Sequence, residues 1–156
     1  MGLKENLRNE PVSRLALRVP VVASAAATVR ESILQMRERK LGCVIIVDDD
    51  HRPLGIFTEG MLRLMLVGNP AAIEERLGDH MKRDVRWVQL TDPVIRVLQA
   101  MQNEKTRFVG VTDSEGRLVG LTGQKGLMEY VAEHFPQQVM VQRIGVAPYS
   151  VKREGA

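Results

Sequence analysis

Apolar runs and polar turns alternate along the chain, and the whole arrangement occurs twice. Residues 43–47 form a continuous apolar run rich in β-branched side chains, which predicts a strand covered on both faces. An acidic turn follows, then a second short apolar run at 54–57 and a helix that begins at Thr58. The same order returns 65 positions later without a gap, so that Gly120 corresponds to Gly55. The chain therefore contains an internal duplication, and its parts are interpreted as two copies of one unit.

Each copy of the unit also has a helix before its first long strand. Thr28 and Glu31 have the spacing of a capping box and predict a helix start. Asp92 and Pro93 take that place in the second copy. Apolar residues at helical spacing predict one buried stripe on each helix, formed by Val29, Ile33, Met36 and Leu41 in the first and by Val94, Leu98 and Met101 in the second.

These elements give each unit the order strand, helix, strand, strand, helix, and they predict an α+β fold. A short strand is expected at 19–23, with Trp87 and Val88 in its place in the second copy, and closing helices are expected at 59–67 and 124–133. A three-stranded unit of about 60 residues is marginal by itself. We therefore expect the two β-α-β-β-α repeats to pack through their sheets about a pseudo-twofold axis.

The predicted domain organisation is two repeats and a tail. The first repeat spans 8–70 and the second 71–136, with a short helix at 71–76 as the connector. Residues 1–10 are expected to form a loose arm, or a short helix that docks elsewhere on the chain. An extended tail is predicted for 137–156.

Composition limits the partners that the chain is expected to have. Its 22 basic and 19 acidic residues leave a net charge of +3. Basic residues in 30–40 alternate with Glu31 and Glu38, which indicates a solvated helix face rather than a nucleic-acid footprint.

No segment approaches the roughly 18 apolar residues of a membrane helix, and no signal sequence is recognised. The single cysteine, Cys43, is expected in the core, and a cytoplasmic location is predicted.

The sequence has no pattern typical of an enzyme or of a metal site. Asp48, Asp49 and Asp50 lack the alternate spacing of a calcium loop and predict a plain turn. The glycine-rich segment 120–126 does not fit the Walker pattern of nucleotide-binding loops. The histidines have no partners at ligand spacing, and the serines lie in no nucleophile elbow. We therefore predict no catalytic residue, no metal and no required cofactor.

The strongest candidate for binding chemistry is Thr58, where a strand runs directly into a helix. The free amides and the positive dipole end of that helix suit an anion, and the hydroxyl stands at the same place. The plainer interpretation is that Thr58 only caps the helix. The two interpretations are compatible, so this stretch alone leaves both open.

On these residues the chain resembles the cystathionine beta-synthase (CBS) domain family, specifically a tandem CBS pair, or Bateman module, of the small stand-alone bacterial type. The resemblance covers about residues 8–136. It rests on the duplicated helices with Met36 and Met101, on the strand ends at Val47-Asp48 and Thr112-Asp113, and on segments 55–59 and 129–136.

The resemblance implies a regulatory module that binds AMP, ATP or another adenosyl compound between the repeats, forms a homodimer and signals to a regulated protein. In the family, a Thr or Ser at the end of the second strand contacts phosphate, and an Asp three residues later holds the ribose. Thr58 matches the first role, but Met61 stands at the Asp position. The second repeat has Gly123 and Gly126 at these positions, so binding is expected mainly in the first half.

Residues near Thr58 are expected to complete the site or to be ordinary core. Gly55, Ile56 and Phe57 precede it on the same strand, Arg107 is a candidate for phosphate, and the base would be walled by Val21, Val22, Cys43, Val44 and Ile45. The alternative function is a degenerate pair that acts only as a dimerisation or interaction scaffold. Nucleic-acid binding by the basic surface is a third interpretation, which salt-dependent retention would support.

Overall fold

The computed structural model describes residues 2–135, so the predicted tail at 137–156 lies outside the described residues. Each half has a three-stranded sheet, with a parallel pair followed by an antiparallel pair. The strands are β1 Val22–Ala23, β2 Cys43–Val47 and β3 Pro53–Thr58 in the first half, and β4 Val88–Gln89, β5 Phe108–Thr112 and β6 Leu118–Gly123 in the second. The helices are α1 Leu3–Asn9, α2 Val29–Arg39, α3 Glu59–Gly68, α4 Ile95–Glu104 and α5 Gln124–His134.

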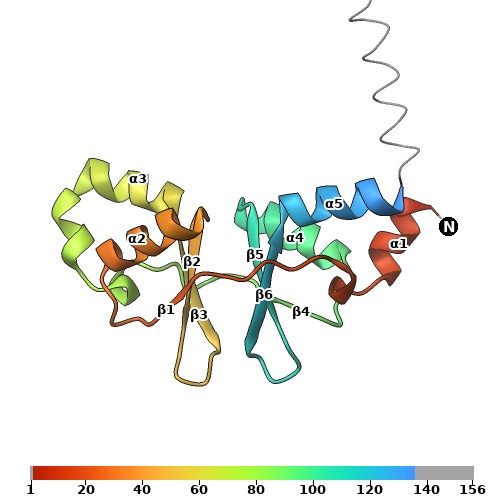
Figure 1. Ribbon diagram of the computed structural model, residues 1–156, viewed down its shortest axis with the longest axis horizontal. Helices are drawn as coiled ribbons and strands as arrows, with labels where there is room; N and C mark the ends of the chain where they lie inside the picture. Colours follow the sequence, from red (N-terminus) through yellow and green to blue (C-terminus); the bar gives the residue numbers. More distant parts are fainter. Residues whose placement is uncertain (1, 136–156) are drawn as a thin grey trace, which may run out of the picture.

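The two halves stand side by side, with their sheets facing each other and helices α3 and α5 at the same edge of the molecule (Figure 1). The internal duplication is confirmed in detail, because β2 and β5, and likewise β3 and β6, begin and end 65 positions apart. Even the irregularity in strand pairing recurs, at Ile46/Val47 and at Val111/Thr112. The predicted α+β fold of two repeats is therefore confirmed.

Local signals explain most element boundaries. The capping box at α2 forms as predicted: the Glu31 N–H donates to Thr28 Oγ1 and the Thr28 N–H donates to the Glu31 carboxylate, both at 3.1 Å. The prediction for α4 was wrong in detail, because the helix begins at Ile95, after Val94. The carboxylate of Asp92 instead accepts a hydrogen bond from the Gln89 N–H at 2.9 Å.

Three further boundaries differ from the sequence prediction. The strand expected at 19–23 is only Val22–Ala23, since Pro20 has no N–H for a ladder. Its counterpart is Val88–Gln89, one residue later than expected, although Ala23 and Val88 hold equivalent registers. The connector helix is a 3-10 turn at Pro70–Glu74. Short strands and single turns carry too little periodicity for their ends to be fixed by pattern.

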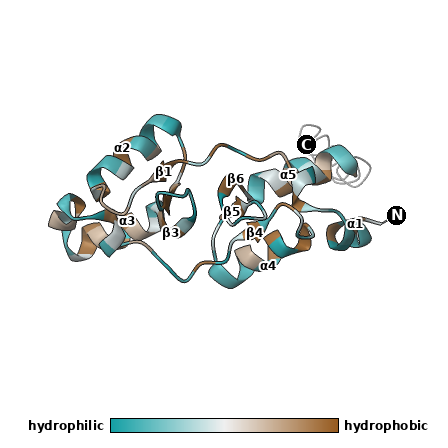
Figure 2. Cartoon of the chain, turned by 90° about the horizontal axis from the view of Figure 1, so that it is seen from below, coloured by the Kyte–Doolittle hydropathy of each residue, from teal (hydrophilic) through white to brown (hydrophobic). Residues whose placement is uncertain are grey.

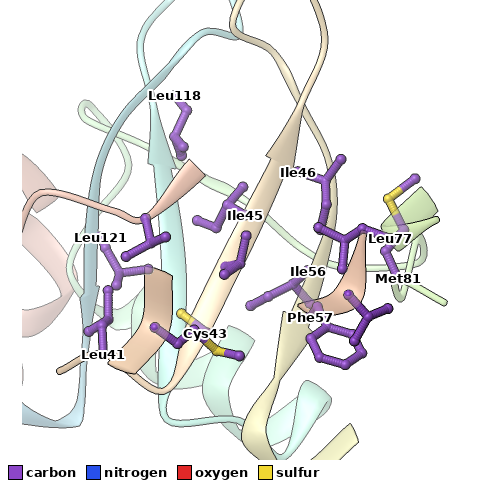
Figure 3. Packing of buried hydrophobic residues seen from close by; sticks show 14 residues of the cluster. Leu41, Cys43, Ile45, Ile46, Ile56, Phe57, Leu77, Met81, Leu118 and Leu121 are labelled. Carbon is purple, nitrogen blue, oxygen red and sulfur yellow. The ribbon is translucent and has the colours of Figure 1, made fainter. Parts of the chain in front are cut away.

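The hydrophobic cores are interlocked between the halves. A 3-10 turn at Leu77–Asp79 follows the connector, and Leu77 and Met81 are buried in the core of the first half. The equivalent early turn, Val12–Arg14, places Val12 in the core of the second half. Figure 3 shows Leu77 and Met81 beside Phe57, with Leu118 and Leu121 of β6 reaching the same cluster. Packing therefore crosses the predicted boundary at 70/71.

Two connecting segments cross between the halves and add backbone bonds to the sheets (Figure 2). Lys82 exchanges two backbone hydrogen bonds with Ile56 of β3, at 3.0 and 2.9 Å. Arg18 makes the same exchange with Leu121 of β6, at 2.8 and 2.9 Å. The segment at 1–10 contains helix α1, whose Leu3 and Leu7 pack against the second core. The N-terminal part of the chain is thus attached to the second repeat.

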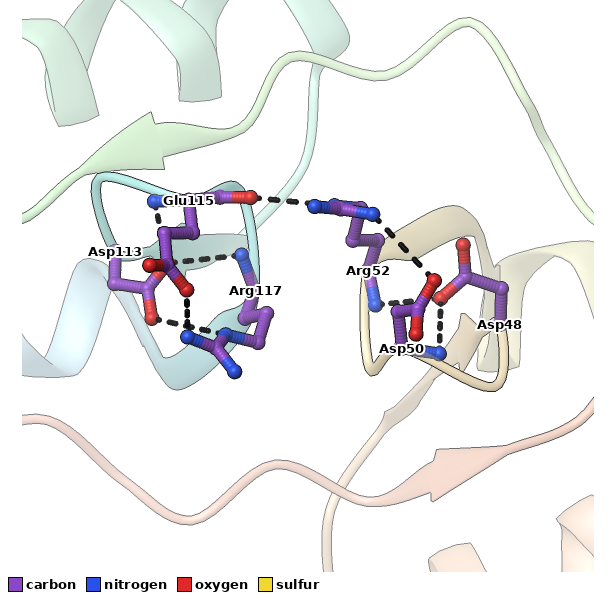
Figure 4. Close-up of polar contacts among 6 residues, drawn as sticks. All are labelled: Asp48, Asp50, Arg52, Asp113, Glu115 and Arg117. Atoms are coloured by element: carbon purple, nitrogen blue, oxygen red, sulfur yellow. Dashed lines mark hydrogen bonds and ion pairs between the residues drawn. The ribbon is translucent and has the colours of Figure 1, made fainter.

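The acidic turns are closed hairpin connections. Asp48 Oδ1 accepts the N–H groups of Asp50 and Arg52, each at 2.9 Å, and Asp113 makes the equivalent bonds to Glu115 and Arg117. Figure 4 shows both turns and the bond from Arg52 Nε to the Glu115 carbonyl, 3.2 Å long, that joins them. Within residues 2–135 no group of three His, Cys, Asp or Glu side chains is placed to hold a metal.

Candidate functional site

The two strand-to-helix junctions each border a cavity. The α3 cleft, of about 450 Å³, lies where β3 enters α3, and its lining includes Ile56, Thr58, Met61, Arg63, Lys82 and Lys105. The α5 cleft, of about 500 Å³, lies where β6 enters α5, and its lining includes Arg18, Glu59, Arg107, Thr122, Lys125 and Gly126. The duplication relates the clefts, since Thr58 and Gly123 hold equivalent positions.

In the α3 cleft, Thr58 is a half-buried helix cap as well as a lining residue. Its Oγ1 accepts a hydrogen bond from the Met61 N–H at 3.3 Å. The side chain of Met61, which replaces the family carboxylate, packs partly against the first core and leaves the cavity open. The capping interpretation therefore applies, and the hydroxyl still lines a space large enough for a small molecule.

Most of the predicted base wall is core and lines neither of these two cavities. Val21, Cys43, Val44 and Ile45 of the predicted wall are buried in the first cluster, and so is Phe57, the candidate that directly precedes Thr58. The reason is that β2 is the central strand of its sheet and is covered on both faces.

The remaining candidates divide between the clefts and the sheet surface. Ile56 lies with Thr58 in the α3 cleft, whereas Arg107 lines the α5 cleft. Val22 is half-buried against the core. Gly55 packs under the connecting segment, where an added Cβ would lie 2.6 Å from the Lys82 carbonyl oxygen. The structure thus brings Thr58 together with Ile56 and separates both from Arg107.

Cys43 is an unreactive core thiol. Its side chain is buried, and loss of solvation on burial raises the pKa of the thiol to about 12. Arg18 acts in the opposite direction and Glu59 in the same direction, but burial is the largest cause. The thiol therefore stays protonated at neutral pH, which excludes a nucleophilic role.

In the α5 cleft, Gly123 is required by its surroundings. A Cβ at this position would lie 1.9 Å from the carbonyl oxygen of Arg107, far inside any permitted contact. No residue with a hydroxyl fits there unless the backbone moves. The absence of Thr or Ser at 123 is therefore a consequence of how β6 enters α5.

Sequence reasoning missed Thr122, the residue before Gly123. Thr122 lines the α5 cleft, is only 4% exposed, and its Oγ1 has no hydrogen-bond partner among residues 2–135. Its equivalent in the first repeat is the fully buried Phe57. The sequence contained one signal for it, a polar residue at a position that is apolar in the other copy of the strand. Such a residue is notable because buried hydroxyls are normally paired.

The starts of α3 and α5 differ in their capping and charge. The α3 helix has the Thr58 cap and Glu59 in its first turn. The α5 helix, of 11 residues, has no side-chain cap and no acidic residue in its first turn. Basic residues line both clefts, and the guanidinium of Arg107 lies 5.7 Å from the centre of the Phe108 ring. Either cleft can accept an anion; α5 begins without a side-chain cap, but the Glu59 carboxylate lines its cleft.

Comparison with known proteins agrees with the duplicated fold. The family model described as CBS domain matches residues 12–68 and 77–133. Arabinose 5-phosphate isomerase KdsD of Yersinia pestis is 36% identical over 121 residues, which are 78% of this chain and 36% of the isomerase. The chain also spans less than two thirds of the length of several other curated relatives.

Two solved structures have the same fold. The CBS domain pair of protein MJ0100, in complex with 5′-methylthioadenosine and S-adenosyl-L-methionine, has a TM-score of 0.69 at 20% identity and covers 79% of this chain and 96% of its own. The CBS domain protein PAE2072 from Pyrobaculum aerophilum, complexed with AMP, has a TM-score of 0.68 at 23% identity and covers 85% and 96%.

Proposed function

This chain belongs to the CBS domain family, and from that premise we propose that it is a regulatory module that senses an adenine nucleotide or a related adenosyl compound between its repeats. The observation that carries the proposal is the pair of cavities, about 450 and 500 Å³, at equivalent strand-to-helix junctions. Cavities of this size are typical of small-molecule sites. The ligands of the two solved relatives, AMP and adenosyl compounds, support this chemical class.

The proposed role is regulatory rather than catalytic and needs no cofactor. Occupancy of a cleft is passed to a separate protein in the cytoplasm. Such a signal requires that the ligand bind two states of the module with different affinity. None of the helices in residues 2–135 is long and apolar enough to cross a bilayer.

Ligand-dependent stabilisation tests the proposal. We expect that at least one of AMP, ATP, S-adenosylmethionine and 5′-methylthioadenosine raises the melting temperature of the full chain. A ligand at 100 times its dissociation constant adds about 2.7 kcal/mol to the free energy of unfolding, which is a shift of several degrees for a domain of this size. Inorganic phosphate and guanosine are the controls. If none of the four adenosyl compounds raises the melting temperature, nucleotide sensing is ruled out.

The alternative function is an interaction scaffold without a ligand. It is favoured by Met61 and Gly126, which leave both repeats without the carboxylate that holds ribose in the family. A hydrogen bond to a charged group contributes about 1.5–3 kcal/mol, so this loss weakens a nucleotide by about tenfold or more. A flat thermal-shift result with all four compounds would favour the scaffold.

We also propose that the chain forms a homodimer through helix α3. Leu64 and Val67 of this helix are 76% and 88% exposed, an apolar surface that favours a partner. We expect the wild type to sediment as a dimer and the Leu64→Lys, Val67→Lys double variant as a monomer. Leu34→Lys on α2, where Leu34 is 52% exposed, is the matched control and should leave the dimer intact. A double variant that still sediments as a dimer would place the interface elsewhere.

A further inference from the structure

The crossing segment at residues 81–85, which we call the strap, forms one wall of the α3 cleft. Its backbone is bonded to the first half, since Lys82 and Ile56 of β3 exchange two hydrogen bonds, at 3.0 and 2.9 Å. Met81 is buried in the first core, and Val85 packs partly against that core. Lys82 and Val85 also line the α3 cleft. The shape of this cleft therefore depends on where the strap lies.

The side chain of Lys82 attaches the strap to the other half of the molecule. Its Nζ donates to Glu104 Oε2 at 2.7 Å, and Glu104 is the last residue of α4. The Glu104 side chain is only 15% exposed, and within residues 2–135 Lys82 is the one cation that pairs with it. A carboxylate with so little access to water depends on its partner more than an exposed one does. Lys82 thus joins the two halves, through its backbone to β3 and through its ammonium group to α4.

The second crossing segment lacks this attachment, although its backbone is bonded in the same way. Arg18 exchanges two backbone hydrogen bonds with Leu121 of β6, as Lys82 does with its own strand. In the first repeat, however, α2 ends at Arg39, where α4 of the second repeat ends at Glu104. Arg18 and Arg39 are both cations, so they cannot form the equivalent ion pair. The attachment through a side chain is therefore specific to the strap and to the α3 cleft.

The two attachments of the strap differ in how easily they are released. Two backbone hydrogen bonds and the buried Met81 hold it to the first half. A single ion pair, in which the Lys82 side chain is 47% exposed, holds it to α4. A partly exposed ion pair is weaker than a buried apolar contact, so it is the attachment that breaks first. Lys82 and Glu104 both line the α3 cleft, where a bound molecule can contact them.

We propose that Lys82 and Glu104 form a latch. While the ion pair is made, the strap joins the two halves and closes the α3 cleft; when it breaks, the strap loosens without unfolding either half. The pair lies where β3 ends and α3 begins, whereas the joined hairpin turns lie at the other end of β3. A closed latch therefore ties the halves together at the end away from the turns. Its regulatory meaning rests on the proposed function, since the latched and unlatched states are two states between which a ligand can select.

Amide hydrogen exchange of the full chain without any ligand, followed by NMR, tests the latch. Glu104→Gln keeps the shape of the side chain and removes its charge. We expect the Ile56 and Lys82 amides of this variant to exchange about threefold to fivefold faster than in the wild type, the factor that corresponds to one partly exposed ion pair. The amides of Arg18 and Leu121, in the crossing segment without a latch, are the internal control and should exchange as in the wild type. The reversed pair, Lys82→Glu with Glu104→Lys, should restore the wild-type protection.

Glu74→Gln is the matched control for the loss of an ion pair. Glu74 pairs with Arg30 of α2, and both side chains are more than half exposed. This pair joins α2 to the 3-10 turn at Pro70–Glu74 and does not involve the strap. We therefore expect the Ile56 and Lys82 amides of Glu74→Gln to exchange at the wild-type rate.

Three results would overturn the latch. Equal exchange of the strap amides in Glu104→Gln and in the wild type would mean that the ion pair does not hold the strap. Equal acceleration at Arg18 and Leu121 would mean that the substitution destabilises the whole chain. If the reversed pair leaves the strap as loose as Glu104→Gln does, charge pairing is not what holds it. Because no ligand is present, the latch stands if the thermal-shift test rules out nucleotide sensing, and nucleotide sensing stands if the latch fails.

Discussion

Gly123→Ala will destabilise the chain by about 3 kcal/mol or more. The added Cβ would lie 1.9 Å from the Arg107 carbonyl oxygen, and its next neighbours, the Arg107 carbonyl carbon and Phe108 Cα, are also backbone atoms. A flexible side chain could move aside, but here β5 or β6 must shift. Because β5 is the central strand of the second sheet, that shift disrupts the packing of the whole second half. Urea unfolding followed by circular dichroism measures the loss.

The matched control is Gly60→Ala. Gly60 lies in α3, two residues after Thr58, which is the equivalent of Gly123 in the first repeat. The nearest atoms to its added Cβ, from Arg63 and Thr58, are 3.7 Å away, an ordinary contact distance. In a helix, alanine is favoured over glycine by about 1 kcal/mol. We therefore expect Gly60→Ala to be neutral or stabilising. If Gly123→Ala unfolds at the same urea concentration as the wild type, the close approach of β6 to Arg107 is not a feature of the folded chain.

Leu77→Ala will lower the free energy of unfolding by about 2–5 kcal/mol. Leu77 follows the connector between the repeats, yet it is fully buried in the core of the first half. The substitution leaves a cavity in the first core, and because Leu118 and Leu121 of β6 belong to the same cluster, we expect both halves to lose stability together. Thermal unfolding followed by circular dichroism and by Trp87 fluorescence should give coincident transitions at a lower temperature.

Leu34→Ala is the control for this substitution, because it removes the same atoms from a side chain that is 52% exposed. We expect a change of less than about 0.5 kcal/mol. Separate transitions by circular dichroism and by Trp87 fluorescence in Leu77→Ala would mean that the halves fold independently. That result would contradict the interlocked packing.

The sequence was sufficient for the repeated elements because their signals are local. A continuous apolar run, an acidic turn and a capping box each act over a few neighbouring residues, and the structure places them where the pattern predicts. Duplication strengthened these signals, since each element was observed twice. The ends of α4 and of the short strands were less certain, because one hydrogen bond, such as that accepted by Asp92, decides them.

The arrangement of the clefts could not be predicted because it depends on contacts between distant residues. Arg107 directly precedes β5 and lines the α5 cleft, whereas Thr58 lines the α3 cleft. The position of Arg107 along the chain does not indicate this separation. From the sequence, Gly123 indicated the loss of a binding hydroxyl. In the structure, the Arg107 carbonyl leaves no room for any side chain at this position. Thr122 was overlooked because one polar residue in an apolar strand does not change the pattern.

The joined hairpin turns limit how the two halves can move. Besides the bond from Arg52 to the Glu115 carbonyl, the Leu118 N–H donates to the His51 carbonyl at 2.9 Å. Both bonds lie at the end of the sheets away from α3 and α5 (Figure 1). Sliding of one half past the other would break these two hydrogen bonds. A small rotation that opens the halves at the opposite end would leave both bonds intact. Any mechanical output from an occupied cleft is therefore largest at the helical edge.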